Sequence, residues 1–466
     1  MPLSIEHLRA HGLSAAAVSA WRSGGIEHLL PLQEKVLTEH GFLHGKSLLV
    51  CAPTSSGKTF VAEMAAVRQM ERNRRVVFLV PTKALAEEKY RSFSTLYGPQ
   101  GYRVAISTRE RPEADKDILT GDYDLLVAVY EKMKAYLVAR PEMLVGVALV
   151  VADEIQTLGE PGRGAMIDLL LTKIAKAPYG SQLIALSAVV GEDAPRLAAW
   201  LGCELIHHRE RPVELREGVF DLSRGEFNYR DAGTGRTGTE PLAEPFTSDD
   251  CFPDAEDVDF RREAILSLAR NLSEERGEQV LLFVPTRYMS RNWAHHLAGR
   301  ASLEPARDVL NEMALYEDTH ARDLLREVLG NGIAFHNADL SWDLRDLIER
   351  HFNSGDIRVL ISTPTLAQGV NLRGRNVLHV PAMIATDRWT GRSTTVPLTR
   401  GRFRNQGGRS GRYRHEEGFG RSILVARNPQ ESERLMRDYV EGHAEPLTPH
   451  QKILFSLAPY GLLWDA

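Results

Sequence analysis

The chain has 466 residues, 43% of them hydrophobic and 26% charged, and a formal net charge of −5. One hydrophobic core rarely serves so long a chain, so we expect two or more domains, and the acidic balance means that a nucleic-acid partner would need a local basic groove. The sequence has no run of about 18 apolar residues, no basic start before an apolar segment and no closely spaced cysteines, which argues against a membrane partner, a signal peptide, a disulfide framework and a zinc site and favours a cytoplasmic protein.

Five short runs rich in Val, Leu and Ile alternate with helical segments in the first part of the chain. They occupy residues 47–51, 75–80, 124–129, 147–153 and 182–188. Strands that alternate with helices imply crossover connections and a parallel sheet covered on both faces. The pattern predicts a first α/β domain over residues 1–212.

This alternation stops between residues 213 and 262 and then resumes. The interruption is rich in turn formers and carries nine acids against one Arg over residues 231–260, so we expect a linker with an exposed acidic loop. Further apolar runs predict a second α/β domain over residues 263–440, followed by a tail over 441–466. These runs lie at residues 278–286, 331–336, 356–363, 375–380 and 421–426.

A loop of small residues follows the first predicted strand and leads into a helical segment. The order of strand, loop, Gly57-Lys58-Thr59 and helix is typical of a P-loop. In such a loop, backbone amides and a helix N-terminus face the phosphates, Lys58 reaches the β- and γ-phosphates, and the Thr59 hydroxyl holds Mg²⁺. Thr54, Ser55 and Ser56 complete the predicted cradle, although Ala52 replaces the usual first glycine. The alternative is an ordinary glycine-containing turn.

Two adjacent carboxylates, Asp153 and Glu154, end the fourth apolar run. P-loop ATPases place their Mg²⁺ carboxylate at the end of another strand of the sheet that carries the P-loop. We therefore expect Asp153 to hold Mg²⁺, and Glu154 to orient and deprotonate the attacking water. ATP and Mg²⁺ are the predicted ligands, and a solvated turn is the alternative for the acid pair.

Several segments, in order along the chain, resemble the superfamily 2 nucleic-acid helicases, and within them the superkiller-like group that includes the archaeal repair helicases. The segments are 26–37, 80–90, 106–110, 127–133, 153–156, 186–190 and 211–220 in the first domain, and 280–287, 334–340, 362–374 and 405–412 in the second. The resemblance implies two tandem RecA-like domains, with ATP in the cleft between them and single-stranded nucleic acid across both. It also implies movement in the 3′-to-5′ direction.

The resemblance assigns further residues to the nucleotide. Gln33 matches the residue that reads adenine, and Gly369 lies in a matching segment of the second domain. Arg409 and Arg412 match residues that reach the γ-phosphate from the second domain, where guanidinium groups stabilise the transferring charge. For these arginines a solvated basic turn is the alternative.

Other matching positions line the path of the nucleic-acid strand or connect that path to the nucleotide. Small hydroxyls, amides and a Lys suit contacts to phosphates that do not read bases. A helix cap is the alternative for each Thr. The strand positions are Pro81, Thr82, Lys83, Thr108, Thr363 and Thr365, and the coupling positions are Gln156, Ser187, Asn405 and Gln406.

Four departures from the family pattern stand out. Gln156 replaces the usual His of the acidic quartet and cannot become cationic. Val189 replaces a hydroxyl residue, and Asn405 stands where the family has Gln, with Gln406 one place late. In the segment 334–340, His336 lacks its usual neighbours, so we assign it no role.

Residues 381–404 lie where the group carries a β-hairpin that wedges into duplex, and their turn Gly and β-branched residues suit a hairpin. A plain connecting hairpin is the alternative. The tail resembles the start of a winged-helix domain, and its leucines would need to dock on the core or on a protein partner.

Taken together, these features predict a nucleic-acid-dependent ATPase, most like a 3′-to-5′ helicase acting on single-stranded or tailed duplex DNA or RNA. A translocase that remodels complexes without separating strands is one alternative. A non-catalytic subunit whose ATP site only controls assembly is another. The sequence does not distinguish DNA from RNA, because both polymers offer the same phosphate track.

Overall fold

The structure is a computed structural model of the whole chain. The chain divides into two compact units, Met1–Glu210 and Arg211–Ala444. Within the described residues, no helix is long and apolar enough to cross a membrane. The described residues are 2–53, 56–108, 114–159, 163–188, 193–208, 210–211, 213–245, 257–317, 319–364, 372, 374–386, 393–410 and 418–442.

The first unit is built on a seven-stranded parallel sheet with the order β3-β4-β2-β5-β6-β1-β7. The five predicted strands are confirmed, and two short edge strands, β3 and β7, are added to them. The strands are β1 (Leu48–Cys51), β2 (Arg75–Val80), β3 (Val104–Ser107), β4 (Leu125–Val129), β5 (Val147–Ala152), β6 (Gln182–Ser187) and β7 (Glu204–His207).

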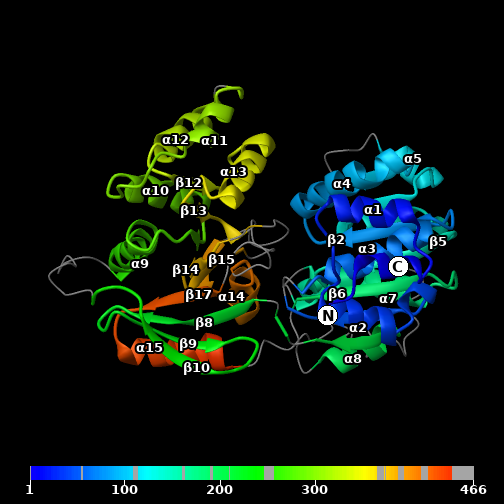
Figure 1. Cartoon of the computed structure of the whole chain (residues 1–466), viewed down its shortest axis with the longest axis horizontal. Helices are drawn as coiled ribbons and strands as arrows, with labels where there is room; N and C mark the ends of the chain where they lie inside the picture. Colours follow the sequence, from blue (N-terminus) through cyan, green and yellow to red (C-terminus); the bar gives the residue numbers. More distant parts are fainter. Residues whose placement is uncertain are drawn as a thin grey trace. The chain divides into compact units, whose positions relative to one another are not determined.

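Helices cover both faces of this sheet (Figure 1). Along β1, Leu48 and Val50 join the core under α1 to α4, whereas Leu49 and Cys51 join the core under α6 to α8. Burial of alternate side chains in two cores explains why each strand is a continuous apolar run. The helices are α1 (Ala15–Ser23), α2 (Pro31–Glu39), α3 (Lys58–Met70), α4 (Lys83–Tyr97), α5 (Asp115–Thr120), α6 (Tyr130–Ala139), α7 (Gly164–Lys176) and α8 (Ala194–Leu201).

The second unit has an eight-stranded sheet with the order β10-β9-β8-β17-β14-β11-β13-β12. Six neighbouring strands are parallel to one another, namely β8, β17, β14, β11, β13 and β12. Strands β9 and β10 extend the sheet beyond β8 in antiparallel fashion. The strands are β8 (Glu214–Asp221), β9 (Glu226–Asp231), β10 (Thr237–Pro241), β11 (Val280–Phe283), β12 (Ile333–His336), β13 (Val359–Ser362), β14 (Asn376–His379) and β17 (Phe419–Ala426).

The helices of the second unit and its small hairpin follow the predicted alternation. The helices are α9 (Asp257–Glu274), α10 (Arg287–Ala298), α11 (Arg307–Met313), α12 (His320–Leu329), α13 (Trp342–Ser354), α14 (Arg400–Gly407) and α15 (Pro429–Leu435). The predicted hairpin within 381–404 is confirmed, because β15 (Ala382–Thr386) pairs antiparallel with β16 (Ser393–Pro397). The predicted tail lies outside the described residues from 443 onward.

The prediction of a linker over residues 213–262 is wrong for its larger part. Residues 214–241 form β8, β9 and β10, and α9 begins at Asp257. Strand β8 pairs with β17 over its full length, and Phe220 is buried in the core of the unit. The turn formers that suggested a loop connect the strands of a meander instead, and Glu240 of the acidic stretch forms ion pairs with Arg216 and Arg421.

Candidate nucleotide and nucleic-acid site

The predicted site residues of the first unit gather at one edge of its sheet. In a parallel sheet the carboxyl ends of all strands share an edge, which is where open α/β sheets bind their ligands. The P-loop follows β1, Pro81 follows β2, Thr108 follows β3 and Asp153 follows β5, while Ser187 ends β6. The fold therefore brings together residues that lie far apart in the sequence.

The P-loop residues form a compact cradle at the start of α3. Gly57, at the helix N-cap, has a φ of 83°, a left-handed conformation that favours glycine. The Lys58 ammonium donates to the carbonyl oxygens of Ala52 at 2.7 Å and Pro53 at 2.8 Å. The Ser56 hydroxyl also donates to Pro53, at 2.6 Å. These contacts hold Lys58 at the helix N-terminus, where phosphates bind.

The rest of the predicted cradle is partly described. Thr59 is half-buried in the first turn of α3, next to Lys58. Thr54 and Ser55 lie outside the described residues.

Gln33 of α2 packs directly on the P-loop. Its Nε2 donates to the carbonyl oxygen of Gly57 at 3.2 Å, and its Oε1 accepts from the backbone N–H of Leu30 at 2.8 Å. A Cβ at position 57 would come within 2.1 Å of this Nε2. The left-handed backbone is what favours glycine at position 57, a Cβ there would displace the Gln33 amide, and Gln33 connects α2 to the cradle.

The carboxylate pair lies at the carboxyl end of β5. Asp153 is 6% exposed, and burial, followed by the charge of Glu154, raises its pKa to about 6. The nearby charges of Lys89 and Lys58 act in the opposite direction. A buried carboxylate opposed by a second acid is the kind of group that a divalent cation stabilises. The donor set therefore fits Mg²⁺, with Thr59 as the second predicted protein ligand.

Glu154 adopts an unusual backbone conformation. Its φ is 53°, in the left-handed region that non-glycine residues rarely occupy. Its backbone N–H donates to Asp153 Oδ1 at 2.9 Å. Such conformations cost on the order of 1 kcal/mol or more and persist where surrounding contacts hold them, often at functional sites.

Gln156 connects the acid pair to the end of β6. Its Nε2 donates to Glu154 Oε2, and its Oε1 accepts from the Ser187 hydroxyl and from the Ala188 backbone N–H, both at 3.2 Å. The neutral amide thus bridges two segments by donating on one side and accepting on the other. Val189 lies outside the described residues.

The predicted strand positions of the first unit occupy the ends of β2 and β3. The Thr82 hydroxyl accepts from the Leu85 backbone N–H at 3.3 Å and so caps α4, of which Lys83 is the first residue. Thr108 is 1% exposed, and among the described residues its hydroxyl has no hydrogen-bond partner. The carbonyl oxygen of Pro81 accepts from the Arg163 guanidinium.

In the second unit only part of the predicted set is described. Thr363 follows β13, is 6% exposed and donates its backbone N–H to the carbonyl oxygen of His336 at 3.2 Å. His336 itself contacts Glu349 at 2.9 Å, in keeping with a structural residue. Arg409, 5% exposed, lies just after α14. Thr365, Gly369 and Arg412 lie outside the described residues.

Gln406 and Asn405 point in different directions on α14. Gln406 is 3% exposed, and its Oε1 accepts from Nδ1 of the buried His379 at 2.9 Å. His379 Nε2 in turn contacts the Ser422 hydroxyl at 2.8 Å. Asn405 is half-buried, and its Oδ1 has no hydrogen-bond partner among the described residues. Gln406 is therefore tied to the sheet of its own unit.

Sequence reasoning missed Tyr130, Arg163 and His379. The Tyr130 hydroxyl donates to the carbonyl oxygen of Asp153 at 2.7 Å, and Arg163 joins Glu131 at 2.8 Å. Tyr130 lies in the segment 127–133 that resembles the helicase family, and it directly follows β4, but the sequence predicted no role for it.

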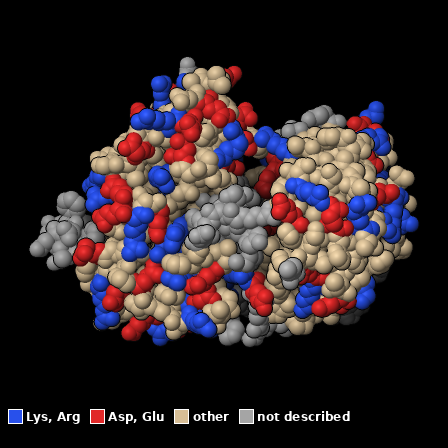
Figure 2. Space-filling model, viewed as in Figure 1, with Lys and Arg blue, Asp and Glu red and all other residues tan. Residues whose placement is uncertain are grey.

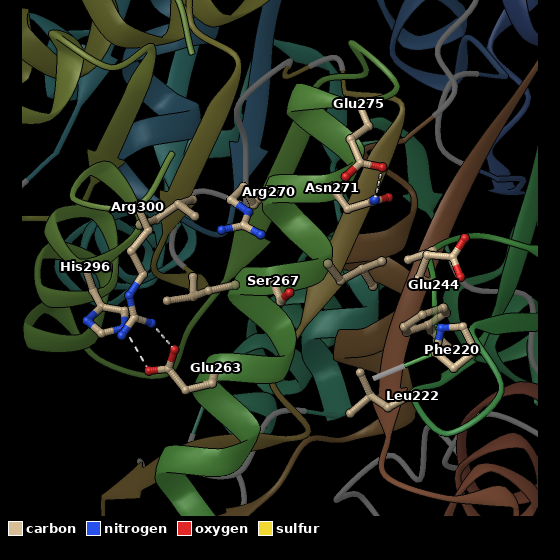
Figure 3. A pocket seen from close by; sticks show the side chains of 15 residues that line it. Phe220, Leu222, Glu244, Glu263, Ser267, Arg270, Asn271, Glu275, His296 and Arg300 are labelled. Atoms are coloured by element: carbon tan, nitrogen blue, oxygen red, sulfur yellow. Dashed lines mark hydrogen bonds and ion pairs between the residues drawn. The ribbon is translucent and has the colours of Figure 1, made fainter. Parts of the chain in front are cut away.

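A cavity of about 500 Å³ lies in the second unit, between α9, the end of α10 and the loop after β10 (Figure 3). Leu266, Leu297 and Phe220 contribute apolar walls, and Glu263 forms ion pairs with His296 and Arg300. None of the predicted site residues lines this cavity. It is therefore distinct from the P-loop edge of the first unit.

Comparisons with known proteins cover most of the chain. Residues 30–197 match the family model of the DEAD/DEAH box helicase, and residues 262–413 match that of the helicase conserved C-terminal domain. The ATP-dependent DNA helicase Hel308 of Methanocella arvoryzae is 33% identical over 447 residues, which cover 94% of this chain and 56% of that protein.

Two further relatives carry the same name. Hel308 of Pyrobaculum calidifontis is 33% identical over 445 residues, covering 94% of this chain and 58% of that protein. Hel308 of Thermococcus kodakarensis is 37% identical over 348 residues, covering 73% of this chain and 28% of that protein. The chain thus spans little more than half the length of the first two relatives.

Proposed function

Because this chain belongs to the superfamily 2 helicases, with a DEAD/DEAH box helicase domain followed by a helicase conserved C-terminal domain, we propose that it is an ATP-dependent DNA helicase. Its ATP hydrolysis would drive movement on single-stranded DNA in the 3′-to-5′ direction. The names of its relatives favour DNA over RNA as the strand. The observation that carries the proposal is the joining of the P-loop, the acid pair and Gln156 at one sheet edge.

The residues at this edge divide the work of hydrolysis. Lys58 and the amides at the start of α3 bind the phosphates. Asp153 and Thr59 would hold Mg²⁺, which would neutralise charge on the phosphates. Glu154 accepts the proton of the attacking water at Oε1, because Gln156 donates to its Oε2.

Coupling to DNA uses the same carboxyl edge of the first unit. Pro81, Thr82, Lys83 and Thr108 would contact the strand backbone there, as would Thr363 and Thr365 in the second unit. Gln156 and Ser187 would transmit strand binding to Glu154 through the amide bridge. Arg409 and Arg412 would sense the γ-phosphate, a role in which arginine commonly stabilises phosphoryl transfer.

The first prediction tests the nucleotide site. Lys58→Ala removes the group that binds the β- and γ-phosphates, so we expect DNA-stimulated ATP turnover to fall at least about 1,000-fold. Steady-state ATPase assays with and without single-stranded DNA measure it. Lys176→Ala, which removes an exposed lysine at the end of α7, is the matched control and retains activity. Unchanged hydrolysis in Lys58→Ala refutes the site.

Strand displacement decides between a helicase and a translocase. A duplex with a 3′ tail is unwound and one with a 5′ tail is not, if the proposal holds. Strand-stimulated hydrolysis without displacement of either duplex selects a translocase instead.

A further inference from the structure

The peptide that joins Asp153 to Glu154 is held by a residue from another element. Tyr130 is the first residue of α6, its side chain is fully buried, and its hydroxyl donates to the carbonyl oxygen of Asp153 at 2.7 Å. The phenol hydroxyl is the donor in this contact, because a carbonyl oxygen can only accept.

This hydrogen bond holds the peptide that directly precedes the left-handed Glu154. Glu154 follows the held carbonyl and has a φ of 53°. Rotation of the peptide would change the direction in which the Glu154 side chain leaves the backbone. The Tyr130 hydroxyl thus opposes relaxation of Glu154 towards a common backbone conformation.

The same helix reaches both predicted strand-contacting loops of the first unit. Glu131, next to Tyr130, pairs with Arg163 at 2.8 Å, and Arg163 donates to the carbonyl oxygen of Pro81. Further along the same helix, the Tyr136 hydroxyl lies 2.6 Å from the hydroxyl of Ser107, the residue before Thr108. Tyr136 also donates to Asp115 at 2.6 Å, which fixes its hydroxyl.

We propose that α6 is a coupling element in which Tyr130 is the positioning residue for Glu154. DNA that contacts the Pro81 and Thr108 loops shifts or steadies α6 through Arg163 and Tyr136. Tyr130 passes that restraint to the peptide between Asp153 and Glu154. The route is separate from the Gln156 bridge, which reaches Glu154 from β6. This inference rests on the proposed ATPase function.

Tyr130→Phe removes only the hydroxyl and leaves the ring in the core. The carbonyl oxygen of Asp153 then loses its donor, and we expect the DNA-stimulated kcat to fall about ten-fold, with the KM for ATP changed less than about two-fold. Tyr123→Phe is the matched control, because Tyr123 is equally buried and lies just before β4, whereas Tyr130 follows that strand. Its kcat stays near the wild-type value.

Two results overturn the role of Tyr130. One is a stimulated kcat in Tyr130→Phe within about two-fold of wild type. The other is an equal loss in Tyr123→Phe, which would reflect general loosening of the core. Wild-type protein that hydrolyses no ATP refutes the proposed function itself, so the two failures are distinguishable.

Arg163→Lys tests whether α6 connects the DNA-contacting loops to Glu154. It tests the proposal by itself if Tyr130→Phe does not fold. The charge near Glu131 is kept, but the planar fork that also reaches Pro81 is lost, so we expect stimulated turnover to fall about three-fold or more. Wild-type stimulation in Arg163→Lys overturns coupling through α6. Thermal melting of each variant confirms that it is folded.

Discussion

At the residue scale, the site combines groups that are costly to bury with contacts that hold them. Asp153 has a raised pKa because it is buried beside a second acid, and Glu154 has a left-handed backbone. The Tyr130 hydroxyl and the Gln156 amide stabilise this arrangement from two directions. Both are neutral groups that donate a hydrogen bond.

His379 gives a pH prediction for the second unit. Burial lowers its pKa to about 4, against an ordinary value of 6.5. Between these values the unfolded chain binds the proton more tightly, so stability rises with pH: the contribution of His379 is complete above pH 6.5 and is lost as the pH falls towards 4. The full effect is at most about 3 kcal/mol.

The measurement is urea unfolding of wild type and His379→Gln at neutral and acidic pH. Gln can donate to Gln406 and accept from Ser422 without titrating, so we expect the variant to lose less stability on acidification. His320→Gln, at an exposed position on α12, is the control and keeps the wild-type pH dependence. Equal acid sensitivity in His379→Gln and wild type contradicts the prediction.

At the element scale, the sequence predicted the strands that are continuous apolar runs and missed β8, β9 and β10, which charged residues interrupt. Strands β1 and β11 are fully buried, so their continuous apolar runs stand out. Strand β10 alternates between exposed and half-buried residues, and its glycine and proline suggested a loop. Its pairing with β9 depends on contacts that local composition does not encode.

The sequence likewise predicted some residues of the candidate site and missed others. Gln33, Lys58, Asp153 and Gln156 belong to motifs with fixed local spacing, so their gathering at one edge followed from the alternation of strands and helices. Tyr130 reaches Asp153 across 23 positions of sequence, and nothing local to either residue encodes that contact.

Gly218 tests whether β8 to β10 belong to the sheet of the second unit. A Cβ at this position would come within 2.1 Å of the carbonyl oxygen of Asn228 and 2.7 Å of the Tyr229 Cα, both backbone atoms of β9. Gly218→Ala must push β9 away, so we expect a loss of about 1–3 kcal/mol in the free energy of unfolding.

Urea unfolding of the full chain measures this loss. Gly299→Ala is the matched control in the same unit, because its nearest neighbour would lie at 3.7 Å and its backbone is right-handed. We expect the control to retain its stability. A Gly218→Ala protein as stable as wild type would show that β9 is not held against β8.

At the scale of the whole molecule, charge does not single out a nucleic-acid partner. The net charge is −5, and in the view of Figure 2 basic and acidic side chains are intermixed on the surface. Attraction to a phosphate backbone must therefore come from a small number of local contacts. Lys83, the first residue of α4 at the carboxyl edge of the first sheet, is the described cation among the predicted strand contacts.

Salt dependence of binding measures how many such contacts form. The logarithm of the association constant for single-stranded DNA should fall linearly with the logarithm of salt concentration, with a slope of about −0.7 for each phosphate contact. Lys83→Ala should weaken binding to all sequences alike and make this slope shallower by about 0.7, because one contact is lost. Fluorescence anisotropy with a labelled oligonucleotide gives both values, with Lys176→Ala as the control. An unchanged slope in Lys83→Ala would show that the DNA strand does not contact Lys83 at the start of α4. It would also contradict the proposed route by which α6 senses DNA.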